Sequence, residues 1–310
     1  MVALVHKTRR IVGKHNQWTT PYWTKLITRL IGSAARFKRP ADYKIGICAA
    51  GRSVKGNYRQ SNEDRWHVDT ASQVFLVADG IGGHVGGEKA AEIAVSTLPN
   101  FLRDALEGPH VDINTMQGAA EEAVASARQK MADYADKHSN CCRMGSTIAM
   151  AAIKREELYF SHIGDSRVYL VRNGSIRRLT TDHTFVQVLV DTGVISEEEA
   201  RIHPQRHCVL NHVGVRDLDQ PPKVASVRLV PGDIIVLATD GLTGVVDDRA
   251  IERIVTHYDD AHDASDALIR EAMRKDSKDN ITCVVVQVLK SRERAYDDDS
   301  VDRCRDSFAA

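Results

Sequence analysis

Two apolar stretches of this chain each run into an aspartate that is followed by glycine. The first begins at Val74 and ends at Asp79, and the second begins at Ile234 and ends at Asp240. An ionised aspartate at the end of a buried strand is costly unless it is paired or binds a metal ion. Glycine lets the backbone adopt positive φ and approach a ligand closely. Two strands that each deliver an Asp-Gly pair therefore predict one shared polar site.

Further carboxylates lie beside other apolar runs. They are Glu63, Asp64, Asp165 and Asp279. Any one of them alone is best interpreted as an ordinary turn residue or helix cap. Gathered together they would repel one another strongly without cations. Oxygen ligands without histidine or cysteine favour Mg²⁺ or Mn²⁺ over zinc.

Runs of apolar and β-branched residues predict the strands that would carry these carboxylates. The expected strands are 45–49, 66–68, 74–78, 147–153, 157–163, 167–172, 176–179, 224–229, 233–238 and 281–289. We expect 66–68 to belong to the hairpin partner of 45–49, with a turn-rich stretch at 51–59. The Asn173-Gly174 pair predicts a type I′ turn between the strands on either side of it.

Helical periodicity predicts two long helices in the first half of the chain. One covers 88–106, and the other is capped by Asp112 and reaches about His138. Residues 182–222 are interpreted as an insertion with two short helices. The second of these opens with a capping box formed by Ser196 and Glu199. Two further helices are expected at 251–258 and 264–273.

Length and composition limit the class of protein. The chain has 310 residues, 43% of them hydrophobic, and 42 basic residues balance 42 acidic ones. Zero formal net charge removes the electrostatic argument for a nucleic-acid binder, so we expect no nucleic-acid partner. No apolar run approaches the roughly 20 residues that span a bilayer, and we expect no secretory signal. Six cysteines without CxxC spacing predict reduced thiols and a cytoplasmic protein.

The two ends of the chain differ from the middle. Residues 1–43 carry nine Lys or Arg against one acid and contain a basic amphipathic helical pattern from Trp23 to Ala34. Such a helix can contact a membrane or a partner. We favour packing against the main domain, or an extension, over membrane contact. The charged residues after 290 predict a disordered tail.

The order of these motifs resembles the metal-dependent Ser/Thr protein phosphatases of type 2C, the PPM family, and especially its bacterial members. The resemblance covers residues 44–289. The motifs that carry it are YRQSNEDRW, VFLVADGIGGHVGGEKAAEIA, GSTIAMAAI, HIGDSRVYLVRNG, TTDHTFV, IIVLATDGL and SKDNITCVVV. It implies an α+β fold, a four-layer αββα sandwich in which helices flank two antiparallel sheets, with a flap at about 184–221.

The resemblance also implies a role for each motif residue. Asp79 would bridge two metal ions, and the Gly80 carbonyl would bind one of them. Asp240 and Asp279 would hold the first ion, and Asp64, with Glu63 acting through water, the second. Asp165 matches the carboxylate that the family uses for a third ion. Arg59 would bind the substrate phosphate, and Asn280 would orient Asp279 or a water.

The expected activity is hydrolysis of phosphoserine and phosphothreonine in proteins. Two Mn²⁺ or Mg²⁺ ions would share a hydroxide that attacks phosphorus, while Arg59 offsets phosphoryl charge. Many eukaryotic members place a histidine, proposed as general acid, where this chain has Ile81. His84 could substitute for it, but a loop histidine is more often only solvated, and a metal-bound water is the alternative proton source.

Two other readings of the motifs remain open. The chain could be a catalytically silent type 2C fold that serves as a regulatory binding module, although retention of the metal carboxylates and Arg59 argues against this. A phosphoacceptor receiver domain shares the strand that ends in aspartate, but the long β-rich chain argues against it. For an active enzyme, the partners expected are phosphoproteins and a Ser/Thr kinase or its substrates.

Overall fold

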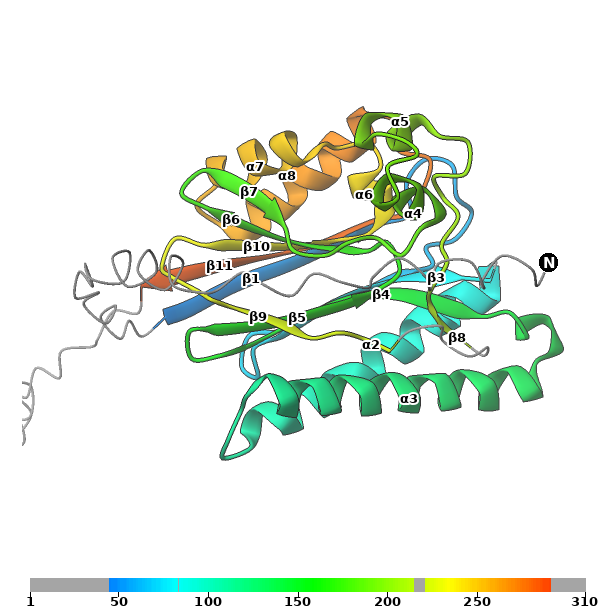
Figure 1. The fold of residues 1–310 in the computed structure, drawn as a ribbon, viewed down its shortest axis with the longest axis horizontal. Coiled ribbons are helices and arrows are strands. Elements are labelled where there is room, and N and C mark those ends of the chain that lie inside the picture. The colour runs from blue at the N-terminus through cyan, green and yellow to red at the C-terminus, as the bar shows by residue number, and fades with distance from the viewer. Residues whose placement is uncertain (1–44, 83, 215–220, 291–310) are drawn as a thin grey trace, which may run out of the picture. The chain divides into compact units, whose positions relative to one another are not determined.

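A computed structural model describes residues 45–82, 84–214 and 221–290. These residues belong to the second of two units of the chain, Tyr43–Ala310. They form two antiparallel sheets that lie face to face, with a pair of long helices on the outer face of each (Figure 1). The four layers confirm the predicted αββα sandwich.

The first sheet has the strand order β1-β11-β10-β6-β7. Its strands are β1 (Ile45–Val54), β11 (Ile281–Lys290), β10 (Ile234–Ala238), β6 (Arg167–Arg172) and β7 (Ser175–Arg178). The β6–β7 connection is the predicted Asn-Gly turn, since Asn173 and Gly174 both have positive φ, as a type I′ turn requires.

The second sheet has the order β2-β3-β4-β5-β9, and β8 pairs with β4 outside this path. Its strands are β2 (Asp64–Asp69), β3 (Val74–Ile81), β4 (Gly145–Lys154), β5 (Glu157–Ile163), β9 (Ala225–Arg228) and β8 (Val213–Gly214).

The helices cover the outer faces of the sheets. On the second sheet lie α2 (His84–Glu107) and α3 (Ile113–Lys137), followed by the short 3₁₀ helix η1 (Ser139–Cys141). On the first sheet lie α7 (Asp248–His257) and α8 (Ala261–Arg274), as Figure 1 shows. Asp112 caps α3 through its side chain, as predicted, and Asp247 caps α7 in the same way.

Successive apolar side chains of the strands point to opposite faces of each sheet, and this divides the core into three layers. On β3, Val74, Leu76 and Ala78 pack against α2 and α3, whereas Phe75 and Val77 pack between the two sheets. The same alternation occurs on β10 and β11, whose other faces pack against α7 and α8. Because successive side chains point to opposite faces, the next residue of β3 that faces the space between the sheets is Asp79.

The flap comprises residues 184–221, of which 184–214 and 221 are described. It contains α4 (Phe185–Asp191) and α5 (Glu197–Ile202), and α5 opens with the predicted capping box of Ser196 and Glu199. Its far end is not a free insertion, because β8 joins the second sheet beside β4. β8 was not predicted, because a strand of only two residues has no recognisable alternation.

Two predictions about the first strands were wrong. β2 pairs with β3 and not with β1, which lies in the other sheet against β11. β1 also continues to Val54, so only the second part of the expected turn at 51–59 is a turn. Both errors have one cause: neighbours in sequence were taken as neighbours in space, whereas the chain crosses between sheets after β1.

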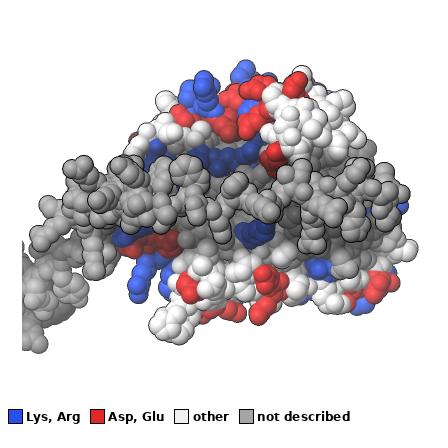
Figure 2. All heavy atoms as spheres, in the orientation of Figure 1, with Lys and Arg blue, Asp and Glu red and all other residues white. Residues whose placement is uncertain are grey.

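Several predictions concern residues outside the described part. They are the basic extension, the amphipathic pattern and the charged tail after Lys290. The five cysteines of the described ranges are free thiols, as predicted. Among the described helices, none combines the length and apolar character needed to cross a bilayer. On the face of the molecule that Figure 2 shows, basic and acidic side chains of the described residues are intermixed.

Candidate active site

The centre of the site is a cross-strand pair of aspartates. Asp64 opens β2 and lies opposite Asp79 near the end of β3. Directly opposed residues of an antiparallel pair point to the same face. For Asp79 that face is the space between the sheets, so both carboxylates enter it where the apolar core ends.

The first sheet supplies hydroxyl groups to the same place. The Thr239 hydroxyl, just after β10, donates to Asp64 Oδ2 over 2.9 Å, and the Thr282 hydroxyl also bonds to Asp64. Asp64 is only 1% exposed. Burial raises the pKa of Asp64 to about 7, because the two threonine hydroxyls only partly offset the lost solvation and Asp240 and Asp279 add repulsion.

Five carboxylates share this region, and we refer to them as the carboxylate cluster. They are Asp64, Asp79, Asp165, Asp240 and Asp279. Burial raises the pKa of Asp79 well above its usual range, and the negative charge of each of the other four raises it further. The pKa of Asp165 is also raised well above its usual range, first by burial and then by Asp240 and Asp182. The predicted site residues therefore lie close enough to control one another's charge.

The glycines after Asp79 and Asp240 have a packing role. A Cβ atom on Gly80 would lie 2.2 Å from the carbonyl oxygen of Gly87, and one on Gly241 would lie 1.8 Å from that of Asn280. Neither glycine has positive φ. Glycine is thus needed after each aspartate because a second backbone segment packs directly against this position and leaves no room for a side chain. This differs from the expectation that these glycines serve approach to a ligand.

Asp240 and Asp279 come from two segments that meet at Gly241. Asp240 is the first residue of the short helix α6 (Asp240–Thr243), so it begins a helix and does not end the strand as expected. Asp279 precedes β11, and its Oδ1 accepts the backbone N–H of Asn280 over 2.7 Å. The backbone N–H of Asn280 therefore orients the Asp279 carboxylate, whereas a contact of Asn280 with a water stays a prediction.

The side chain of Asn280 has a different task. Its Oδ1 accepts the backbone N–H of Glu63 over 2.9 Å. Its Nδ2 donates to the carbonyl oxygens of Lys55 and Ser61, each over 2.9 Å. Asn280 therefore fastens the whole 55–63 loop, and with it Glu63 and Arg59, to the start of β11.

Arg59 lies at the exposed rim of the cluster. Its Nη2 donates to Asp279 Oδ2 over 2.6 Å. Burial opposes the charge of Arg59, but the hydrogen bond and negative charge of Asp279 outweigh this effect and raise the pKa of Arg59. A guanidinium has five N–H donors, so Arg59 keeps others that an anion at the rim can use.

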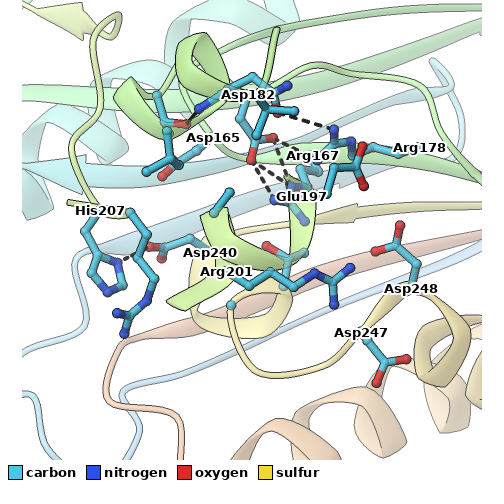
Figure 3. A pocket seen from close by; sticks show the side chains of 18 of the residues that line it. Asp165, Arg167, Arg178, Asp182, Glu197, Arg201, His207, Asp240, Asp247 and Asp248 are labelled. Atoms are coloured by element: carbon cyan, nitrogen blue, oxygen red, sulfur yellow. Dashed lines mark hydrogen bonds and ion pairs between the residues drawn. The ribbon is translucent and has the colours of Figure 1, made fainter. Parts of the chain in front are cut away.

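A cavity of about 430 Å³ opens beside Asp165 and Asp240, and the flap forms one of its walls (Figure 3). Elsewhere in its lining, Arg167 of β6 forms a two-pronged ion pair with Asp182, with contacts of 2.6 to 3.1 Å. His207 of the flap brings its Nδ1 to 3.7 Å from Asp240 Oδ2. The carboxylate cluster thus lies next to a recess large enough for side chains of a peptide.

The donor atoms fit a divalent cation. Asp64 Oδ1 and Asp240 Oδ1 are buried and have no hydrogen-bond partner among the described residues, although buried acceptors are normally satisfied. All groups of the cluster offer oxygen, which Mg²⁺ and Mn²⁺ prefer. Within the described ranges, no three acidic, histidine or cysteine side chains converge on one point as a ready-made site. The fit therefore rests on the donor chemistry and the two unpartnered oxygens.

Two other predicted residues have clear places. The Gly80 carbonyl lies against the backbone of Gly87, at the start of α2. His84 is the first residue of α2, and its side chain is outside the described part. Sequence reasoning missed Thr239, although its place directly before Asp240 in the LATDGL motif was a usable signal. It also missed the contact of His207 with Asp240 and the side-chain hydrogen bonds of Asn280. These contacts join segments that are far apart in sequence.

Comparison with known proteins places these features in a family. A model of the family described as protein phosphatase 2C matches residues 54–280, which is most of the chain. The chain belongs to the protein phosphatase 2C family. The matched region contains β2 to β10 and ends at Asn280, and so includes the whole carboxylate cluster.

Bacterial phosphatases are among its relatives. The serine/threonine protein phosphatase PstP of Mycobacterium tuberculosis is 32% identical over 240 residues, which are 77% of this chain and 45% of PstP. The chain thus spans less than half of that relative. The serine/threonine phosphatase stp of Listeria innocua is 29% identical over 239 residues, 76% of this chain and 94% of stp.

Solved structures agree with the fold. The catalytic domain of PstP in complex with two manganese ions is 30% identical and superposes with a TM-score of 0.70. The match covers 79% of this chain and 99% of that domain.

Proposed function

We propose that this chain is a Mn²⁺- or Mg²⁺-dependent phosphatase that hydrolyses phosphoserine and phosphothreonine in proteins. The observation that carries the proposal is the carboxylate cluster itself. Asp64 and Asp79 enter from one sheet and Asp240 and Asp279 from the other, and two of their oxygens are buried without partners. Family membership and the manganese complex of PstP support the same activity.

The proposed division of labour follows from where each residue lies. Asp79, central in the cluster, would contact both cations, with Asp240 and Asp279 on one side and Asp64 on the other. The Gly80 carbonyl and Glu63 would complete the oxygen ligands, and Asp165 would serve a third cation. When bound, the cations lower the pKa of a water nucleophile and neutralise phosphoryl charge.

Arg59 and the cavity would handle the substrate. Arg59 is held by Asp279 at the rim, so its free donors can bind two phosphate oxygens and keep phosphorus over the cluster. The recess beside Asp240 would take the residues that flank the phosphorylated one. The phosphoprotein partners, including a Ser/Thr kinase or its substrates, are part of this proposal.

The deciding experiment measures phosphate release from a phosphothreonine peptide with Mn²⁺ and with EDTA. We expect turnover with Mn²⁺, none with EDTA, and a loss of roughly a hundredfold to a thousandfold in kcat for Asp79→Asn. Asp69→Asn, at the other end of β2 in a surface turn, is the matched control and should stay near the unmodified rate.

A folded protein that releases no phosphate with any divalent ion would contradict the proposal. That result would favour the regulatory binding module, and the next measurement would then be capture of a kinase or scaffold partner.

A further inference from the structure

The flap is closed at its base by contacts between its two arms. Thr184 forms a β-bridge with Val209. The N–H of Phe185 donates to the Cys208 carbonyl over 2.9 Å, and that of Leu210 to the His183 carbonyl over 2.8 Å. His183 is therefore the residue at which the flap leaves the sandwich.

The same histidine is bonded twice to Gly164. Its backbone N–H donates to the Gly164 carbonyl over 2.8 Å, and the N–H of Gly164 donates to its ring Nδ1 over 3.2 Å. Gly164 has a φ of +103°, and a Cβ there would lie 2.6 Å from the side chain of Thr147. The turn is thus held from the strand side by Thr147 and from the flap side by His183. The next residue is Asp165.

The ring of His183 is fixed in one form. Because a peptide N–H donates to Nδ1, this nitrogen carries the lone pair and the ring proton is on Nε2. The ring stacks on His162, with 4.5 Å between centroids. Burial, helped by His162, lowers the pKa of His183 to about 4, so the acceptor form is the one present at neutral pH.

We propose that His183 is a positioning residue that ties the flap to the Gly164–Asp165 turn, so that the flap and the Asp165 carboxylate keep their places together. The cavity beside the cluster has both partners in its wall, Asp165 on one side and flap residues from Thr184 onward on the other. A peptide that displaces the flap would therefore act on Asp165 through His183. The role of Asp165 in catalysis rests on the proposed function, whereas the link between His183 and Gly164 does not depend on it.

Two substitutions separate the hydrogen bond from the packing of the ring. His183→Asn keeps an acceptor near the place of Nδ1, whereas His183→Phe keeps a ring to stack on His162 and has no acceptor. His203→Phe is the matched control, because the ring Nδ1 of this flap histidine accepts a local hydrogen bond from the N–H of Gln205, two residues away, and its ring lies 6.3 Å from that of Phe185.

The first measurement is amide hydrogen exchange in the metal-free protein over 162–167 and 207–211. We expect exchange in both segments to be roughly fivefold to tenfold faster in His183→Phe and near the unmodified rate in His183→Asn and His203→Phe. Unchanged exchange in His183→Phe, or equal acceleration in His183→Asn, would overturn the tie.

A second measurement uses the unmodified protein and so does not depend on folding of a variant. Nitrogen-15 NMR at pH 7 should find His183 Nδ1 unprotonated and coupled through the hydrogen bond to the Gly164 amide. A protonated Nδ1 would refute the proposal.

A third measurement follows turnover with Mn²⁺ and phosphopeptide. His183→Phe should raise the Mn²⁺ concentration for half-maximal activity several-fold, and His183→Asn should restore it. Equal Mn²⁺ dependence in both variants would contradict the link to Asp165. Because exchange and NMR need neither metal nor turnover, an inactive enzyme would refute only the proposed function.

Discussion

At the scale of single residues, the site is dominated by like charges that the fold forces together. Asp79 is surrounded by four other carboxylates, and Arg59 is the cation that bonds directly to one of them, at Asp279. The hydrogen bond to Asp279 orients the guanidinium of Arg59. Its other N–H donors have the planar, forked arrangement that binds phosphate.

The contribution of Arg59 can be tested by substitution. We expect Arg59→Ala to lower kcat/KM for a phosphopeptide by roughly tenfold to a hundredfold, since a charge-assisted hydrogen bond is lost. Arg59→Lys should recover only part of this, because an ammonium group cannot bind two oxygens side by side. Steady-state kinetics measure both.

The control for this test is Arg103→Ala, on the exposed surface of α2. It should leave kcat/KM unchanged. If Arg59→Ala also left kcat/KM unchanged, Arg59 would have no role in binding phosphate.

The identities of the carboxylates could be predicted from sequence because each follows or precedes an apolar run. Asp64, Asp79, Asp165, Asp240 and Asp279 all lie in the cluster. The contacts of His183 and His207 could not be predicted in this way. Both sets of contacts depend on the position of the flap in the fold. The residues on either side of His183 and His207 in the sequence do not indicate that position.

At the scale of elements, the site depends on how loops are fastened to strand ends. Asn280 holds the 55–63 loop through three hydrogen bonds at the start of β11. No helix or strand shapes this loop between Val54 and Asp64. Its conformation therefore depends on a side chain from the other end of the sequence.

We expect Asn280→Ala to lower the free energy of unfolding by about 2 to 3 kcal/mol, because three backbone groups lose their partner. The rate of phosphopeptide hydrolysis should fall by more than the smaller folded fraction alone explains, because Glu63 and Arg59 lie in the loop that Asn280 no longer holds. Urea denaturation and kinetics on the same samples make the comparison. Asn100→Ala, which removes two exposed hydrogen bonds within α2, should change stability by less than about 0.5 kcal/mol.

Strand existence was predictable at this scale and strand pairing was not. Nearly all expected strands are present because apolar alternation is local. The partner of β1 could not be inferred, because β11 lies at the opposite end of the described chain and no turn connects them. β8 is too short to produce any alternation.

At the scale of the whole molecule, the two sheets are apolar where they face each other and acidic at one end. The acidic end should make the metal-free protein sensitive to pH. Burial and mutual repulsion raise the pKa values of Asp64, Asp79 and Asp165, so the folded state binds more protons than the unfolded chain. The contribution of these three groups to stability is fully present below their unfolded pKa and is lost as pH rises through the folded pKa of Asp64, about 7.

We therefore expect the Tm in EDTA to fall by roughly 5 °C between pH 5 and pH 8, and Mn²⁺ at pH 8 to reverse the loss. Asp79→Asn should flatten the pH dependence in EDTA, since one of the repelling charges is gone. Thermal unfolding followed by circular dichroism checks this. A Tm that rises with pH in EDTA would show that the carboxylates are not strained by one another.

A second prediction at this scale concerns the N-terminal segment. The family match begins at residue 54, and the described core begins with β1. Deleting residues 1–40 should leave turnover of a short phosphopeptide within about twofold, because a domain with its own core folds by itself. A deletion variant that fails to fold, or that has lost all turnover, would contradict this.

The pairing of β1 with β11 also has a consequence for synthesis of the chain. Strands β2 to β5 are consecutive neighbours and can assemble while translation continues. β1 must wait, since its partner in the sheet is β11, the last strand of the described residues, and β10 waits with it. Until β11 leaves the ribosome, both keep an unpaired edge that can capture other chains. The carboxylate cluster is therefore completed only after β11 has left the ribosome, and a nascent chain stalled before Ile281 exposes two unpaired strand edges and lacks a complete site.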